Sequence, residues 1–187
     1  MTIDGLSQLN QKEPLALIDA VINDVLADIS VNKSAYQQDQ KQLQKMVNTR
    51  IAPHFDFMRI AQLTMGKNWR EANESQRMQI AEAFQALLVR TYANRLLDIP
   101  ENPKDRVTVK SQHYPNPNRT IINMAVRRTH GDPVNLSLRM EKRNDAWQVI
   151  DVMIDGVSLV ISYRTQFEYK IRSSGIDALI TSLSEEW

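Results

Sequence analysis

The chain has 187 residues, of which 42% are hydrophobic, and a net charge of +1. This length suits one domain, and the apolar fraction is enough for a core. The near-neutral charge gives no overall field that would attract nucleic acid or a membrane surface. The absence of cysteine excludes disulfides, thiolate catalysis and Cys-ligated metals. No apolar run reaches the roughly 18 residues of a membrane span.

The first half of the chain is predicted to be helical. Apolar residues recur with a period near 3.6 over residues 12–30, 35–51 and 57–65, and again from about residue 73 onward. Candidate N-caps precede the last three of these helices at Ser34, Asp56 and Asn73, and Gln76 completes a variant of the capping box. One face of the fourth helix carries Met78, Ala81, Phe84, Leu88, Tyr92 and Leu96.

The second half changes to a period of two. Alternating apolar and polar residues predict half-buried strands over residues 107–110, 120–126 and 134–140. Residues 147–154 are apolar at more positions and predict a fourth strand. Short turn sequences between the strands predict an antiparallel meander. After Gly156 the period returns to helical, Gly175 breaks it, and a last helix starts at about residue 176.

This order of elements predicts an α+β fold, in which an antiparallel four-stranded sheet packs against several helices. We expect one domain over residues 1–187. Its helical part covers about residues 1–98, its sheet about 105–155, and its C-terminal helices about 157–187.

No motif for catalysis or metal binding is present. The three histidines share no metal-ligand spacing, and there is no phosphate-binding glycine loop. Ser158 follows a strand-to-helix turn, where a nucleophile stands in some hydrolases, but a serine there also caps the next helix, which we favour. Asp151 and Asp155 are the nearby carboxylate pair, and acid–base work by them requires a cleft that the sequence does not show. We therefore expect no enzyme, no metal and no cofactor.

Basic residues gather in the sheet region. Residues 104–143 hold nine basic and three acidic residues. This excess predicts either a docking face for an acidic partner or anionic headgroups, with Arg127 and Arg128 as candidates, or the solvated outer face of a sheet, which we favour.

Four stretches, taken together and in order, resemble the MlaC family, also called the toluene-tolerance auxiliary family. They comprise Phe55-Asp-Phe57 with Met65-Gly66 and Trp69-Arg70; Gln76-Arg77 with Ala83-Phe84 and Leu87–Tyr92; Trp147–Val152 with Gly156–Val160; and Tyr163-Arg164, Gln166-Phe167, Ile171-Arg172 and Gly175–Ile180. The resemblance covers roughly residues 15–185. The chain departs from the family pattern at residues 73–76, where Asn-Glu-Ser-Gln stands in place of the frequent Thr-Pro-Glu-Gln.

The resemblance implies a periplasmic phospholipid carrier with a fold related to the NTF2-like cone. Its apolar pocket, between sheet and helices, would take the acyl tails of a phospholipid cargo and leave the headgroup in water. The implied partners are an outer-membrane lipoprotein–porin complex and an inner-membrane ABC transporter with an MCE-type subunit. Family members are exported and cleaved, so the chain would be a mature form without its signal peptide.

We predict that the pocket is lined by apolar side chains of the strands and of the helices that could face them. The strand candidates are Val107, Val109, Ile122, Met124, Leu136, Leu138, Met140 and Val152, and the candidates from the helical part are Phe84, Leu88, Tyr92, Val157, Val160 and Tyr163. Periodicity alone fits a closed core equally well. Arg90 and Arg164 stand near the pocket mouth or hold the fold together. The alternatives are a ligand-free NTF2-like interaction module and an NTF2-like enzyme.

Overall fold

The structure, a computed structural model, describes residues 13–100, 107–113 and 116–185. It begins with α2 (Pro14–Gln38), in which Pro14 occupies the first turn, where its missing N–H costs nothing. This helix continues about eight residues past its predicted end. Ser34 lies inside it, so the predicted cap at Ser34 is wrong. The chain turns instead at Asp39, whose side chain accepts a hydrogen bond from the Lys41 N–H and caps α3 (Gln40–Arg50).

The remaining helices of the first half begin at the predicted caps. A short 3₁₀ turn, η1 (Ala52–His54), leads to α4 (Phe57–Met65), whose first turn is capped by Asp56. After η2 (Gly66–Arg70), the predicted capping box of Asn73 and Gln76 starts α5 (Glu74–Tyr92), with both reciprocal hydrogen bonds formed. The 3₁₀ segment η3 (Ala93–Asp98) ends this half.

An antiparallel sheet with strands in sequence order follows. It contains β1 (Val107–His113), β2 (Arg119–Val126), β3 (Val134–Arg143), β4 (Ala146–Ile154) and β5 (Val157–Ser158). The α+β prediction is confirmed, but the described part of the sheet has five strands rather than four, because two residues after Gly156 pair with the end of β4 before the next helix begins. The register between β3 and β4 shifts after Arg139, which marks a β-bulge.

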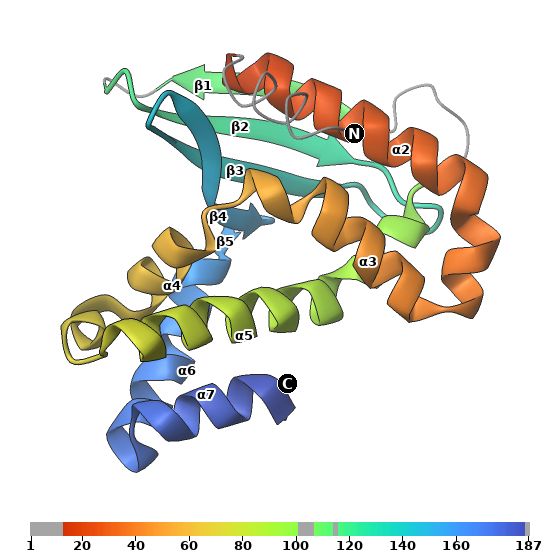
Figure 1. Cartoon of the computed structure of the whole chain (residues 1–187). Coiled ribbons are helices and arrows are strands. Elements are labelled where there is room, and N and C mark those ends of the chain that lie inside the picture. Colours follow the sequence, from red (N-terminus) through yellow and green to blue (C-terminus); the bar gives the residue numbers. More distant parts are fainter. Residues whose placement is uncertain (1–12, 101–106, 114–115, 186–187) are drawn as a thin grey trace.

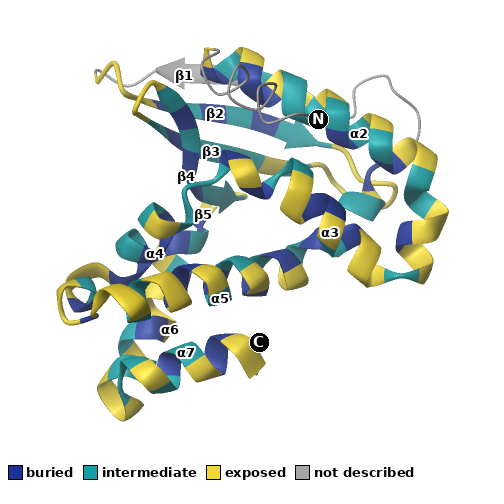
Figure 2. Cartoon of the chain, in the orientation of Figure 1, coloured by how far each residue is buried: buried dark blue, intermediate teal, exposed yellow. Residues whose placement is uncertain are grey.

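The C-terminal helices are α6 (Leu159–Ser174) and α7 (Ile176–Glu185), separated by Gly175 at a positive φ of 88°. Figure 1 shows α2 lying along one face of the sheet, while α4 to α7 gather below it. Buried residues form stripes on the facing sides of these elements (Figure 2). The buried hydrophobic residues that the structure describes form three clusters. One lies between α2 and the sheet, one among the lower helices, and one between α2, α3 and the end of α5.

Candidate functional site

One face of the sheet is apolar and lies under α2. The register pairs Val109 with Met124, Met124 with Leu136, and Ile122 with Leu138, so these side chains share a face. Leu17 and Ile18 of α2 are buried in the same cluster. All eight strand residues predicted for the pocket belong to this cluster, which we call the α2–sheet cluster.

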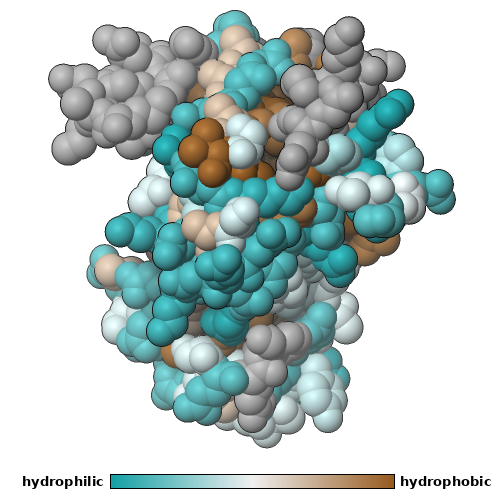
Figure 3. Space-filling view, turned by 90° about the vertical axis from the view of Figure 1, so that its right-hand side faces the viewer, coloured by the Kyte–Doolittle hydropathy of each residue, from teal (hydrophilic) through white to brown (hydrophobic). Residues whose placement is uncertain are grey.

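The α2–sheet cluster is only partly closed. Of the eight strand residues, Ile122, Met124 and Met140 are buried, and the others are partly exposed. Ten of its hydrophobic residues are partly buried and only seven are buried. Most of the partly buried residues that the sequence did not predict lie on the side of α2 that faces the sheet: Leu15, Val21 and Ile22. Figure 3 shows hydrophobic atoms reaching the surface in the upper part of the molecule, at the level of this layer.

The predicted residues from the helical part do not join the strand residues. Phe84 packs edge-to-face on Tyr163 and Phe167, with ring centroids 5.1 and 5.0 Å apart. Val160 is buried in the same cluster, and Leu88 packs against it. We call this cluster, shared by α4 to α7, the lower cluster. Burial and the neighbouring Tyr92 raise the pKa of Tyr163 to about 12.

The two remaining predicted residues lie outside both clusters. Tyr92 is half-buried at the end of α5, and Val157 on β5 is 60% exposed. The structure therefore divides twelve of the predicted pocket residues between two clusters, which share the partly buried Phe55. The sequence does not reveal which helix covers the sheet, because an apolar stripe fits any apolar surface.

Ser158 caps α6, as favoured from the sequence. Its Oγ accepts a hydrogen bond from the Ile161 N–H at 3.1 Å and donates to Asp151 Oδ2 at 2.6 Å. The other oxygen of Asp151 accepts from the Val160 N–H at 3.2 Å. A buried carboxylate at the positive end of a helix is well placed for stabilisation. Through these hydrogen bonds, Ser158 and Asp151 stabilise the start of α6.

The two candidate mouth arginines bind backbone carbonyls. Arg164 of α6 donates two hydrogen bonds to the Leu63 carbonyl, at 3.1 and 2.7 Å. Arg90 of α5 donates to the Leu183 carbonyl at 3.2 Å. Each arginine thus connects two helices, which fits the alternative that these residues hold the fold together. Their partners are backbone carbonyls and not the carboxylates that we expected.

Among the described basic residues of the sheet region, Arg119, Arg139 and Arg143 alternate onto the face opposite α2. Arg127 and Arg128 lie in the loop after β2, where Arg128 donates to the Asp132 carbonyl. On the face opposite α2, Glu141 is flanked by Arg119 at 3.4 Å, Arg143 at 3.7 Å and Arg59 of α4 at 3.6 Å. The solvated-face interpretation agrees with this arrangement. Lys104 and Arg106 lie outside the described residues.

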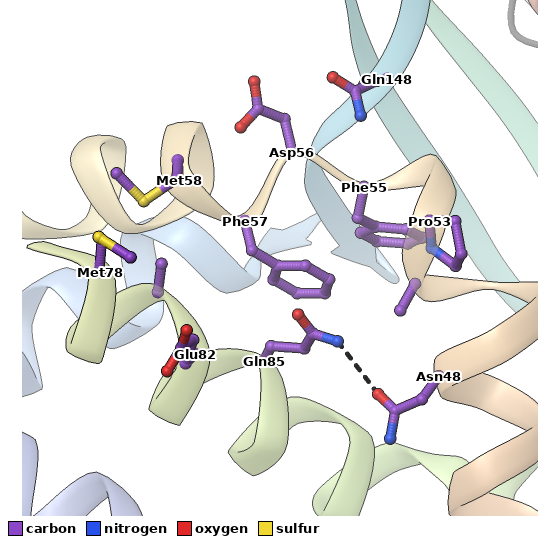
Figure 4. A pocket seen from close by; sticks show the side chains of 12 residues that line it. Asn48, Pro53, Phe55, Asp56, Phe57, Met58, Met78, Glu82, Gln85 and Gln148 are labelled. Atoms are coloured by element: carbon purple, nitrogen blue, oxygen red, sulfur yellow. Dashed lines mark hydrogen bonds between the residues drawn. The ribbon is translucent and has the colours of Figure 1, made fainter. Parts of the chain in front are cut away.

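A separate pocket of about 470 Å³ contains none of the fourteen predicted residues. It lies between α3 with η1, α4, α5 and β4, as Figure 4 shows. Met78 lines it and is 51% exposed, although it belongs to the predicted apolar face of α5 that includes the buried Phe84. Sequence reasoning missed this pocket because its residues come from five elements and share no periodicity.

Among the residues that the structure describes, no cluster of three or more His, Cys, Asp or Glu side chains is placed to hold a metal ion. No helix among them is long and apolar enough to cross a membrane.

These features define an α+β protein in which one long helix incompletely covers the apolar face of an antiparallel sheet. Residues 19–185 match the family model described as MlaC protein. The chain therefore belongs to the MlaC family.

Individual relatives agree with this assignment. The chain is 22% identical over 179 residues to the intermembrane phospholipid transport system binding protein MlaC of Haemophilus influenzae, covering 94% of this chain and 82% of that protein. It is 23% identical over 165 residues to the toluene tolerance protein ttg2D of Pseudomonas putida, covering 88% and 75%. The structure also resembles that of the phospholipid-binding protein from Ralstonia solanacearum in complex with a phospholipid. That match has a TM-score of 0.80 and 30% sequence identity, and covers 93% of this chain and 96% of the other.

Proposed function

We propose that this chain binds phospholipid and carries it through the periplasm, without catalysing a reaction and without a metal or cofactor. The acyl tails lie between α2 and the apolar face of the sheet. The observation that carries this proposal is the α2–sheet cluster, where partly buried hydrophobic residues outnumber buried ones. The likeness to the Ralstonia solanacearum protein in complex with a phospholipid supports it.

The proposed lining combines strand and helix residues. The strands contribute Val107, Val109, Ile122, Met124, Leu136, Leu138, Met140 and Val152, and α2 contributes Leu15, Val21 and Ile22. The predicted residues Phe84, Leu88, Val160 and Tyr163 then support the site from the lower cluster instead of touching lipid. Tyr92 and Val157 have no assigned contact with the tails.

Energetics determine how such a carrier works. Exposing a buried methylene to water costs about 0.8 kcal/mol, so one tail of about 15 methylenes costs on the order of 10 kcal/mol. Release into water is therefore negligible, and handover requires docking. The headgroup stays in water, because burying an unpaired phosphate costs far more. The proposed docking partners are an outer-membrane lipoprotein–porin complex and an inner-membrane ABC transporter with an MCE-type subunit.

The first test is extraction of lipid from the purified protein, followed by mass spectrometry. Stoichiometric phospholipid is expected. The Val109→Glu substitution should abolish it, because Val109 is partly buried beneath α2 and a carboxylate there would meet the tails. Thr108→Glu is the matched control, since Thr108 is the exposed neighbour on the same strand.

Circular dichroism on both variants separates loss of lipid from loss of fold. Val109→Trp, which fills the site without adding charge, provides a second variant if Val109→Glu does not fold. Wild-type protein without lipid, and unable to take it up from phospholipid vesicles, would favour the alternative of a ligand-free NTF2-like interaction module. Normal lipid content in a folded Val109→Glu variant would contradict the site assigned here.

A further inference from the structure

The pocket beside α4 and α5 differs from the α2–sheet cluster in its position and its chemistry. Its apolar part consists of Phe55 and Phe57, whose rings stack 5.6 Å apart, together with Met58 and Met78. Met58 is 42% and Met78 51% exposed, although the described residues bury most of their large hydrophobic side chains. Figure 4 shows the two methionines on neighbouring helices at one end of the pocket. Exposed thioethers adapt to different apolar side chains and are common at protein-binding surfaces.

The charged side chains that line this pocket are all acidic. They are Asp56 and Glu82, and the lining includes no lysine, arginine or histidine. Asp56 is engaged: it caps α4 through the Arg59 N–H at 2.9 Å and meets Arg143 at 3.4 Å. Glu82 is exposed on α5 and forms no ion pair with the described residues. Its carboxylate is therefore available to a cation from outside.

The polar remainder of the lining is made of amides. Gln85 donates to Asn48 at 3.1 Å across one wall, and Gln148 comes from the face of β4 opposite α2. Side-chain amides offer both donors and acceptors, as a peptide backbone requires. The unpaired carboxylate of Glu82 disfavours a phosphate, so a lipid headgroup is a poor occupant.

We propose that this pocket is a docking site for a segment of a partner protein, in which a large apolar side chain stands beside a lysine or arginine. The apolar side chain packs between the phenyl rings and the two methionines, and the cation pairs with Glu82. Of the residues that line this pocket, only Phe55 also packs against the α2–sheet cluster. The inference goes beyond the proposed function and stands without it.

A phage-displayed library of random short peptides, selected on the purified full chain, tests the proposal. Enriched peptides should combine an aromatic or large aliphatic residue with an adjacent lysine or arginine. Fluorescence anisotropy with one synthesised peptide then measures its affinity for variants. Met78→Glu and Glu82→Lys should each weaken binding by about tenfold or more. Changing the lysine of the peptide to glutamate should restore binding to the Glu82→Lys variant.

Gln79 provides the matched controls. It neighbours Met78 on the exposed side of α5 but does not line the pocket, so Gln79→Glu and Gln79→Lys should leave the affinity unchanged. Glu82→Gln serves if Glu82→Lys does not fold, as judged by circular dichroism.

The proposal would be overturned by any of the following results: no enriched peptide, enriched peptides that are acidic, affinity that survives both pocket variants, or a dimer of the chain that Met78→Glu dissociates. Lipid content measured on the same samples keeps the two proposals apart. Loss of lipid in a folded Met78→Glu variant would assign the pocket to lipid and also overturn it.

Discussion

At the residue scale, Ser158 shows how a serine in a position typical of a nucleophile can have a structural role. Its hydroxyl joins the start of α6 to the buried Asp151. Ser158→Ala removes the cap and leaves one carboxylate oxygen of Asp151 without its donor. We expect the free energy of unfolding to fall by about 1–3 kcal/mol, measured by urea denaturation.

Ser162, one turn further along α6, provides the comparison. It donates a hydrogen bond to the Ser158 carbonyl at 2.9 Å and does not contact Asp151. Ser162→Ala should change stability by less than about 0.5 kcal/mol. Equal effects of the two substitutions would show that the Ser158–Asp151 bond contributes little.

His54 gives a pH dependence. It is 3% exposed in η1, and burial lowers its pKa below the ordinary value of 6.5, against the opposing effect of Asp24. The unfolded chain therefore takes up this proton first as the pH falls. The contribution of neutral His54 to the free energy of unfolding should be fully present above pH 6.5. It should be lost as the pH drops from there towards the lower pKa of the folded state.

The measurement is urea denaturation at about pH 7.5 and about pH 5.5, on either side of the ordinary histidine pKa. His54→Gln, which cannot take up a proton, should lose less stability between the two conditions than the wild type does. The same loss in both proteins would show that His54 is equally protonated in the folded and unfolded states.

At the element scale, the sequence predicts helix starts well where the capping chemistry is local. Asp56 and the pair of Asn73 and Gln76 cap α4 and α5 as expected, because each cap involves residues three apart. Ser34 failed as a cap, although serine is a good one. The chain remains helical through it, and Tyr36 stays buried within α2. Tertiary packing of Tyr36 outweighs the preference of Ser34 for an N-cap position. The chain turns at Asp39, which caps α3 instead.

The strands were also predictable from a local signal, the alternation of apolar and polar residues, but their ends were not. Alternation places Ile122, Met124 and Leu138 on one face whatever covers them. The two-residue β5 was missed, because no alternation can be read from two residues, and its pairing depends on the turn at Gly156. Hydrophobic periodicity therefore predicts which face of an element is buried. It does not predict where the element ends, because the ends depend on contacts with other parts of the chain.

At the scale of the whole molecule, the uncertain step was which helix meets which surface. The sequence gathered Phe84 and Val160 with the strand residues, but α5 and α6 bury these side chains among the lower helices. Helix α2 covers the sheet instead, through Leu17 and Ile18. Both helices have suitable apolar faces, and only long-range packing decides between them. The lower cluster contains more buried than partly buried residues, and the α2–sheet cluster, where we propose that the tails lie, contains fewer.

Removal of lipid should therefore loosen one layer and spare the other. Hydrogen exchange followed by mass spectrometry, on protein before and after delipidation, measures this by segment. We expect faster exchange in α2, β1 and β3, because their partly buried residues lose the packing that the tails provide. Exchange in α5 to α7 should stay unchanged, since Phe84, Phe167 and Leu179 are already at most 1% exposed. Loss of protection confined to α5 to α7 would instead place the lipid in the lower cluster and restore the helical residues to the site.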